Sequence, residues 1–233
     1  MVIISKSCNI KLKIWIHSNQ TSVQLLNFSI GVQVYRKGRE YMTYKKEVRK
    51  LYKEIAQQME VKPPPLIISG KSKELNARDL RLFITINKSL ASLVFKENDL
   101  VRCIIAHELT HYKNGDTKTR YKNCYRIYSK TVQAYSLVCE LRASICGYTY
   151  IGMKSESEIM ETEKKFKIPE FFVDKEAAYR VGYPTSEQIA FFASRFDKLT
   201  VEIARELLED YCNILKIKNK DKFIKHVLKV VKV

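Results

Sequence analysis

The feature that most constrains this chain is a pair of histidines in an apolar helical stretch, within Ala106-His107-Glu108-Leu109-Thr110-His111. In an α-helix, residues i and i+4 lie on one face, so His107 and His111 can bind one metal ion together. Glu108 lies one position further round and can reach a water molecule beside that metal without binding the metal itself. This H-E-x-x-H pattern predicts a zinc site that activates water for hydrolysis.

The residues around the motif indicate a well-bounded helix whose histidines face the interior. The residues at helical spacing before the motif are mostly apolar and lead into the first histidine: Leu100, Cys103, Ile104 and His107. Asn98-Asp99 is a favourable pair for the N-cap, and Asn-Gly-Asp at 114–116 is a favourable stop. We therefore predict a helix over about 96–114. The alternative is that both histidines are ordinary half-buried residues of such a helix.

A catalytic zinc site uses three protein ligands, so a third ligand is expected elsewhere in the chain. Glu140 is the best candidate, because it lies in an otherwise apolar helical pattern over 118–150. A carboxylate in such surroundings is costly unless it is paired or bound to a cation. Two alternatives remain open at this point. Glu140 could pair with Arg142 or Arg126, and Glu176 is the second candidate for the third ligand.

The composition indicates a globular protein. The chain has 233 residues, of which 45% are hydrophobic, so it can bury a substantial core. No apolar run is long enough to cross a bilayer, and lysines interrupt the apolar patches of residues 1–16, as they would not in a signal peptide. We therefore expect a cytoplasmic protein. The six cysteines show no paired spacing, which favours reduced thiols over disulfides or a second metal site.

The charge is strongly basic, with 42 lysines and arginines against 25 acidic residues and a net charge of +17. Such a balance permits binding to nucleic acid, anionic lipid or an acidic protein. The lysines are nevertheless spread along the chain and are concentrated only at the C-terminus. We therefore expect a protein or peptide substrate as the partner, rather than nucleic acid.

The part of the chain before the histidine motif predicts a small sheet. Short alternating segments within residues 1–38 are typical of strands, and an apolar stripe predicts a helix over 39–60, which three prolines end. Strands are expected at 66–70 and 82–87, with a polar loop over 71–79 between them. An extended peptide could join the edge of such a sheet as an additional strand.

The part after the motif predicts helices. Beyond the pattern at 118–150, residues 151–171 are polar, with glutamates on a solvated face of a connection or a short exposed helix. Further helices are expected at 172–181, 187–195, 200–213 and 216–233. The middle pair could mimic a helix-turn-helix, although plain helical packing is the commoner arrangement. We expect a core of residues 1–150 and a helical C-terminal region of residues 151–233, which could pack on that core as one domain.

From Asn98 through the H-E-x-x-H motif to Asp116, the chain resembles gluzincin metallopeptidases of the HtpX-like and CAAX-prenyl-protease-like family. In that family, an Asn-Ala pair like Asn76-Ala77 precedes a strand like 82–87, and a helix of this type follows. The resemblance covers roughly residues 60–147. It implies a zincin-like fold and zinc-dependent proteolysis. Many members also carry membrane-spanning helices, so this chain resembles a soluble form with the peptidase domain alone.

The resemblance also concerns the third ligand. The family uses a glutamate in an E-x-x-A-D-like setting on a later helix, which matches Glu140-Leu141-Arg142-Ala143-Ser144 except at the last position. The aspartate usual there would orient a ligand histidine. Ser144 is shorter and uncharged. The site is therefore expected to be weaker, unless another residue such as Asp116 orients the histidine.

We predict an α+β, predominantly helical fold, in which a zincin-like peptidase domain carries a small sheet packed on the motif helix and a helical C-terminal region follows. The predicted function is that of a zinc endopeptidase, with His107, His111 and Glu140 binding Zn²⁺ and Glu108 acting as general base.

Two features of this prediction stay open. The second group that stabilises the oxyanion could come from Tyr148, Arg180 or Tyr183, and the substrate is expected along the strand 82–87. The alternative function is a catalytically weak or inactive protein that keeps the metalloprotease fold and serves as a regulatory or binding protein, including one that acts near nucleic acid.

Overall fold

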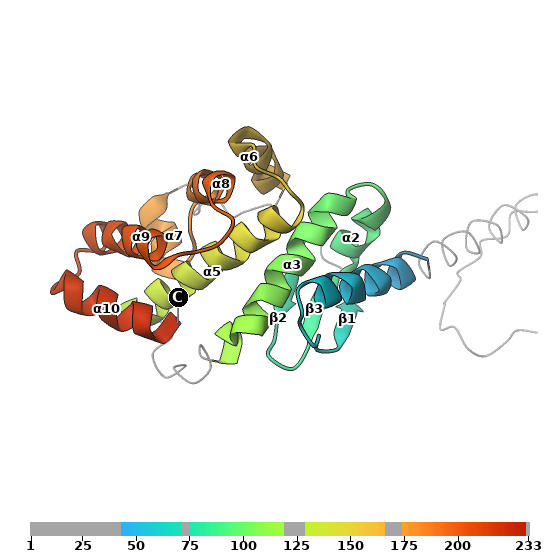
Figure 1. Ribbon diagram of the computed structural model, residues 1–233, viewed down its shortest axis with the longest axis horizontal. Helices are drawn as coiled ribbons and strands as arrows, with labels where there is room; N and C mark the ends of the chain where they lie inside the picture. Colours follow the sequence, from blue (N-terminus) through green and yellow to red (C-terminus); the bar gives the residue numbers. More distant parts are fainter. Residues whose placement is uncertain (1–42, 71–74, 119–128, 166–173, 232–233) are drawn as a thin grey trace, which may run out of the picture. The chain divides into compact units, whose positions relative to one another are not determined.

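A small mixed sheet lies beside the helix that carries the two histidines (Figure 1). The computed structural model describes residues 43–70, 75–118, 129–165 and 174–231, so the strands expected within 1–38 lie outside the described residues. Strand β1 (Leu66–Ser69) pairs in parallel with β3 (Ile84–Asn87), and β2 (Ala77–Asp79) pairs antiparallel with β3. The strand order is β1-β3-β2, so β3 is central.

Strand β2 is a correction to the sequence analysis, which expected a polar loop over 71–79. Its three residues, Ala-Arg-Asp, show no hydrophobic alternation, so the pattern gave no strand signal. The strand forms because β3 offers it a ladder of backbone hydrogen bonds in the register Ala77 to Ile86 and Asp79 to Ile84. Because β2 also packs against the motif helix, the sheet edge next to that helix is β2 and not the strand expected at 82–87.

The first hydrophobic cluster joins the sheet to the helix over 43–58 and to the motif helix. Residues 43–58 form a helix that ends before the three prolines, as expected, and its buried stripe packs with strands β1 and β3. Helix α2 (Lys88–Ala91) and the 3-10 helix η1 (Ser92–Phe95) then lead from β3 into the motif helix. These two short elements lie where the sequence analysis expected only a connection.

The motif helix is α3 (Asn98–Asn114), close to the expected 96–114. Its N-cap is Glu97 rather than the expected Asn98-Asp99 pair, because the Asn98 side chain donates instead to the carbonyl oxygen of Val94, at 3.1 Å. It ends as expected at Gly115, whose φ of 67° is the left-handed conformation that favours glycine at this position.

Helix α5 (Lys130–Tyr150) packs along α3, and the two lie side by side in Figure 1. It begins after Ser129, whose side chain accepts a hydrogen bond from the backbone of Val132. Gly147 permits a close approach, since a Cβ atom there would lie 2.8 Å from the carbonyl oxygen of Cys103 on α3. The two helices that carry the candidate site are therefore held nearly backbone to backbone at this point.

The other face of α5 packs on the C-terminal helices in a second hydrophobic cluster. These helices are α6 (Glu156–Lys165), α7 (Lys175–Val181), α8 (Ser186–Arg195), α9 (Val201–Ile214) and α10 (Lys220–Val231). Helices α8 and α9 both contribute to this cluster. The four described cysteines are free thiols, as expected.

Glu163 on α6 is a second correction. The sequence analysis placed the glutamates of this segment on a solvated face, and Glu156, Glu158 and Glu161 are indeed exposed. Glu163 is only 6% exposed, because it lies one turn after the buried Ile159 and shares its face of the helix. It therefore points into the protein.

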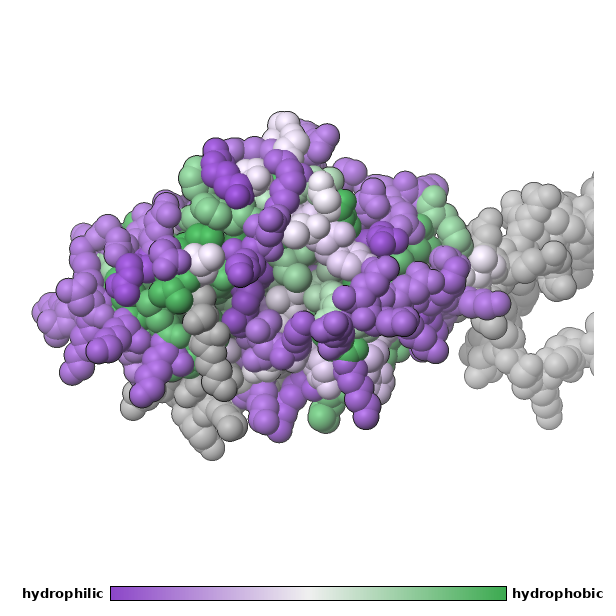
Figure 2. Space-filling model, in the orientation of Figure 1, coloured by the Kyte–Doolittle hydropathy of each residue, from purple (hydrophilic) through white to green (hydrophobic). Residues whose placement is uncertain are grey.

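The fold class is confirmed as α+β, predominantly helical and zincin-like. Among the helices of the described residues, none has the length and apolar character needed to span a membrane. On the face drawn in Figure 2, hydrophilic residues predominate, and hydrophobic residues show as smaller areas between them. Met42–Val233 form one compact unit.

Candidate active site

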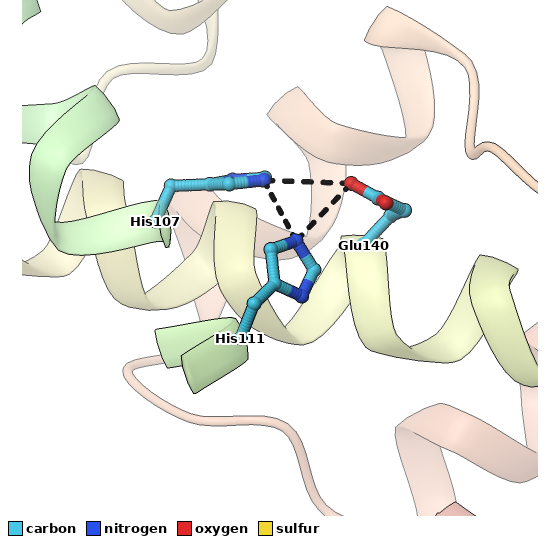
Figure 3. A group of neighbouring side chains, drawn as sticks. All are labelled: His107, His111 and Glu140. Carbon is cyan, nitrogen blue, oxygen red and sulfur yellow. Dashed lines mark hydrogen bonds and ion pairs between the residues drawn. The ribbon is translucent and has the colours of Figure 1, made fainter. Parts of the chain in front are cut away.

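The structure brings the side chains of His107, His111 and Glu140 together (Figure 3). Both histidines come from α3, one turn apart, and Glu140 comes from α5. The two Nε2 atoms lie 3.1 Å apart, and Oε2 of Glu140 lies 3.4 Å from each of them. Three potential ligand atoms therefore converge on one point from two helices.

These distances fit a tetrahedral metal ion. With metal–ligand bonds of about 2.0–2.1 Å, two ligand atoms of a tetrahedron lie about 3.3–3.4 Å apart. The observed separations of 3.1, 3.4 and 3.4 Å are close to that value. Two imidazole nitrogens and one carboxylate oxygen are also the ligand set of a catalytic zinc site that keeps a fourth position open. The residues present therefore fit zinc.

The outer nitrogen of His111 is held by Asp116. Its Nδ1 lies 2.9 Å from Oδ2 of Asp116, while Oδ1 of the same carboxylate accepts a hydrogen bond from Arg142 at 2.5 Å. A proton on Nδ1 facing this carboxylate leaves the Nε2 lone pair for a metal. Arg142 thus pairs with Asp116 and not with Glu140, which removes one alternative for Glu140. Arg126, the other proposed partner, lies outside the described residues.

The outer nitrogen of His107 has a weaker partner. Oγ of Ser144 lies 3.5 Å from its Nδ1, which is long for a hydrogen bond that involves a hydroxyl group. The side chain of His107 is 22% exposed, against 10% for that of His111. His107 is therefore the less firmly oriented of the two histidines, as the serine at position 144 led us to expect.

Glu108 is buried beside the cluster and is held by the edge strand. Its Oε2 accepts a hydrogen bond from the backbone N–H of Asp79 at 2.6 Å. Burial raises the pKa of Glu108, and the two imidazoles offset this only in part. Glu140 differs, because burial also opposes its ionisation, yet the imidazoles hold its pKa below the ordinary value. The pKa values of the two carboxyls are therefore shifted in opposite directions.

Two cavities meet at this cluster, with volumes of about 330 and 340 Å³. They share six lining residues: Ala77, Arg78, His107, Glu108, Glu140 and Tyr183. The first, which we call the α6 cavity, continues toward Cys103 and Glu163, while the second continues toward His111 and Asp116. Space is therefore available on both sides of the three ligand atoms, along strand β2.

The remaining residues that the sequence suggested lie in different places. Glu176, the second candidate for the third ligand, is exposed and pairs with Arg180 at 2.5 Å, and neither residue lines the two cavities. Tyr148 is buried, and its hydroxyl donates to Glu163 at 2.5 Å. Tyr183 lines both cavities. Of the three oxyanion candidates, only Tyr183 therefore combines proximity to both cavities with partial exposure.

Comparison with protein families gives an independent finding, because residues 43–152 match the family model of peptidase family M48. The match covers 110 of the 233 residues of the chain (152 − 43 + 1). Over these residues the chain is similar to a metallopeptidase family, and the resemblance inferred from its motifs is confirmed. The comparisons with curated proteins and with solved structures found no match.

The matched segment contains the three clustered residues and Glu108, but it ends before α6. Glu163 and Tyr183 therefore lie beyond it and line the cavities from elements outside the family match. Sequence reasoning missed Glu163. The spacing of four residues from Ile159 was the signal that could have placed it on a buried face.

Proposed function

We propose that this protein is a zinc endopeptidase in which His107, His111 and Glu140 bind the metal and Glu108 is the general base. The observation that supports this most directly is the convergence of the three ligand atoms at 3.1–3.4 Å, with a buried carboxyl of raised pKa beside them. The residues of this ligand set come from two helices whose close packing fixes their separation.

Zinc, when bound, would lower the pKa of its water and polarise the scissile carbonyl. Glu108 takes the proton of the attacking water and passes it to the leaving amine. The Asp79 N–H bonds to Oε2, which leaves Oε1 of Glu108 for that water. Asp116 and Arg142 keep the His111 ring in the tautomer that presents Nε2 to the metal.

The substrate would lie along β2. The sequence analysis expected it along 82–87, but that strand is central and its backbone is already paired on both sides. Strand β2 is the edge that packs on α3, and Ala77 and Arg78 line both cavities. An extended peptide that pairs with β2 would pass directly over the three ligand atoms.

Tyr183 is the group we propose for stabilising the oxyanion. It lies in the turn between α7 and α8 and lines both cavities together with His107 and Glu140. A scissile carbonyl bound at these residues would therefore face the same space as Tyr183. Tyr148 is a poorer choice because its hydroxyl proton is directed to Glu163. Arg180 is a poorer choice because it pairs with Glu176 at the surface.

The test combines metal content with hydrolysis of casein and of a peptide library. We expect about one zinc per chain by elemental analysis, because a catalytic zinc site uses three protein ligands. Glu108→Gln should keep the zinc and lower kcat by at least about 100-fold, since it removes the general base. Glu140→Gln should lose most of the zinc.

Glu176→Gln is the matched control, because it makes the same chemical change at an exposed glutamate and should alter neither zinc nor hydrolysis. Full zinc with no hydrolysis of any peptide would contradict the proposal and support the alternative of a regulatory or binding protein. The family match does not favour that alternative. The cytoplasmic location expected from the sequence stays a prediction.

A further inference from the structure

Besides Glu108 and Glu140, the α6 cavity combines apolar walls with one further carboxyl group. The apolar walls come from α3 and from the segment leading into α8, and include Ile104, Pro184 and Ile189. Glu163 on α6 lines the same cavity. At about 330 Å³, the cavity is large enough for a long side chain.

Glu163 has few partners for a buried carboxylate. Its Oε1 accepts a hydrogen bond from Tyr148 at 2.5 Å, while Oε2 lies 3.5 Å from Oγ of Ser186, which is long for a hydroxyl donor. An ionised carboxylate offers about four acceptor positions. Within the described part of the chain, no ion pair includes Glu163.

No lysine or arginine of the described chain neutralises this carboxylate. Arg78 is the one lysine or arginine among the described residues that line the α6 cavity, and it lies on the edge strand, exposed and outside ion-pair distance of Glu163. Burial raises the pKa of Glu163, and the hydrogen bonds from Tyr148 and Ser186 and the nearby His107 offset this only in part. A cation supplied by a ligand would lower the cost of ionising Glu163.

The combination of apolar walls and a buried carboxylate matches a long amphipathic side chain. Lysine and arginine bury an alkyl stem against apolar surface and present a cationic head. A purely apolar side chain would fill the walls but would further dehydrate Glu163 without giving it an opposite charge. The opening of the cavity at His107, Glu108 and Glu140 places such a side chain next to the reacting bond.

We propose that the α6 cavity binds a lysine or arginine side chain of the substrate, on a residue that flanks the scissile bond, and that Glu163 determines this specificity. This inference rests on the proposed peptidase function. Tyr148 acts as the positioning residue, because it lines the same cavity and its hydrogen bond holds the carboxylate of Glu163.

The test uses two series of blocked alanine–serine octapeptides. In the first series, lysine is substituted at each position in turn. In the second series, norleucine is substituted at the same positions, because it has an alkyl stem without the ammonium group. We expect zinc-loaded wild-type protein to cleave beside lysine with a kcat/KM at least about tenfold above that for norleucine, since hydrogen bonds to charged groups are the strong ones. Glu163→Gln should remove this preference, so that its kcat/KM for lysine peptides falls to its own value for norleucine peptides.

Glu161→Gln is the matched control, because it makes the same change on the same helix at an exposed residue that pairs with Lys164. It should keep the lysine preference. Thermal unfolding of both variants checks that each is folded. Equal rates for lysine and norleucine peptides with wild-type protein would overturn the proposal, as would a lysine preference that survives in Glu163→Gln.

A binding measurement separates this proposal from the peptidase function. The same peptides are titrated into zinc-loaded Glu108→Gln protein, which should bind substrates without cleaving them, and their affinity is measured by calorimetry. We expect lysine peptides to bind more tightly than norleucine peptides, and we expect this difference to disappear when Glu163→Gln is added. That result supports the cavity assignment even if wild-type protein hydrolyses nothing. Equal binding of both series would overturn the assignment even if hydrolysis is found.

Discussion

The two histidines of the candidate site are chemically identical but differ in the hydrogen-bond partners of their Nδ1 atoms. His111 faces a carboxylate at 2.9 Å that Arg142 in turn holds, whereas His107 faces a hydroxyl at 3.5 Å. The partners of a ligand histidine fix its tautomer and raise its basicity, so the stronger pair should carry more of the metal affinity. We therefore expect zinc affinity to depend more on Asp116 and Arg142, which hold His111, than on Ser144, which faces His107.

We predict that Asp116→Asn weakens zinc binding by about 10–100-fold, because asparagine removes the charge that holds the Nδ1 proton of His111. The measurement is competition for zinc against a chromophoric chelator at neutral pH. Ser144→Ala is the comparison, since it removes the long contact to His107, and it should change the affinity by less than about threefold. A larger loss in Ser144→Ala than in Asp116→Asn would contradict this order.

At the scale of elements, the site depends on how closely α3 and α5 approach. The proposed ligand histidines lie on α3 and the proposed ligand Glu140 lies on α5, so the distances between their ligand atoms follow from the separation of the two helices. Gly147 sets that separation at one point, because the space that a Cβ atom would need is taken by the carbonyl oxygen and the sulfur of Cys103, at 2.8 and 3.1 Å. The backbone contact cannot be relieved by a change of rotamer.

We predict that Gly147→Ala lowers the free energy of unfolding by about 1–2 kcal/mol, despite the better helix propensity of alanine. It should also weaken zinc binding, because it separates the elements that hold the ligand atoms. Urea denaturation and zinc competition measure the two effects. Adding Cys103→Ala relieves only the contact to sulfur, so it should not restore stability. A double variant as stable as Cys103→Ala alone would show that the backbone contact is harmless.

Sequence reasoning located the elements whose pattern is local. Helix α3 was predicted to within two residues at its start, since its apolar spacing and its glycine stop are both visible along the chain. Strand β2 was missed because it exists only through pairing with β3, which follows it in the sequence. Glu163 was missed because four glutamates in one charged segment suggested solvent, although helical spacing from Ile159 places only this one inside.

The metal-binding residues of the candidate site could be predicted from the sequence, but the residues that surround them could not. The H-E-x-x-H spacing fixes two ligand atoms on one helix face, and an acidic residue in an apolar helix indicated Glu140. Asp116 was named only as one residue that could replace an expected aspartate, because nothing in the sequence shows that the turn after Gly115 returns it to His111. The position of Tyr183 also depends on tertiary packing, since it lies 43 residues after Glu140 by numbering (183 − 140) and on another element.

At the scale of the whole molecule, the site lies between two hydrophobic clusters. One joins the sheet, the helix over 43–58 and α3, and the other joins α5 to the C-terminal helices. The family match ends at residue 152, yet α6 and the turn before α8 supply Glu163 and Tyr183 to the cavities. The described C-terminal helices therefore complete the cleft, and the division into residues 1–150 and 151–233 stays a prediction.

Because the three ligand residues come from α3 and α5, a bound metal would link the two clusters. A ligand that binds only the folded state adds stability that grows with its concentration over Kd, about 4 kcal/mol at 1,000 times Kd. For a chain of this size, this corresponds to roughly 10 °C in the midpoint of thermal unfolding.

We predict a shift of that size between zinc-saturated protein and protein treated with a chelator, measured by circular dichroism at equal scan rates. Glu140→Gln should abolish most of the shift, whereas Glu176→Gln should keep it. Equal midpoints with and without chelator in wild-type protein would contradict a metal that links the two helices.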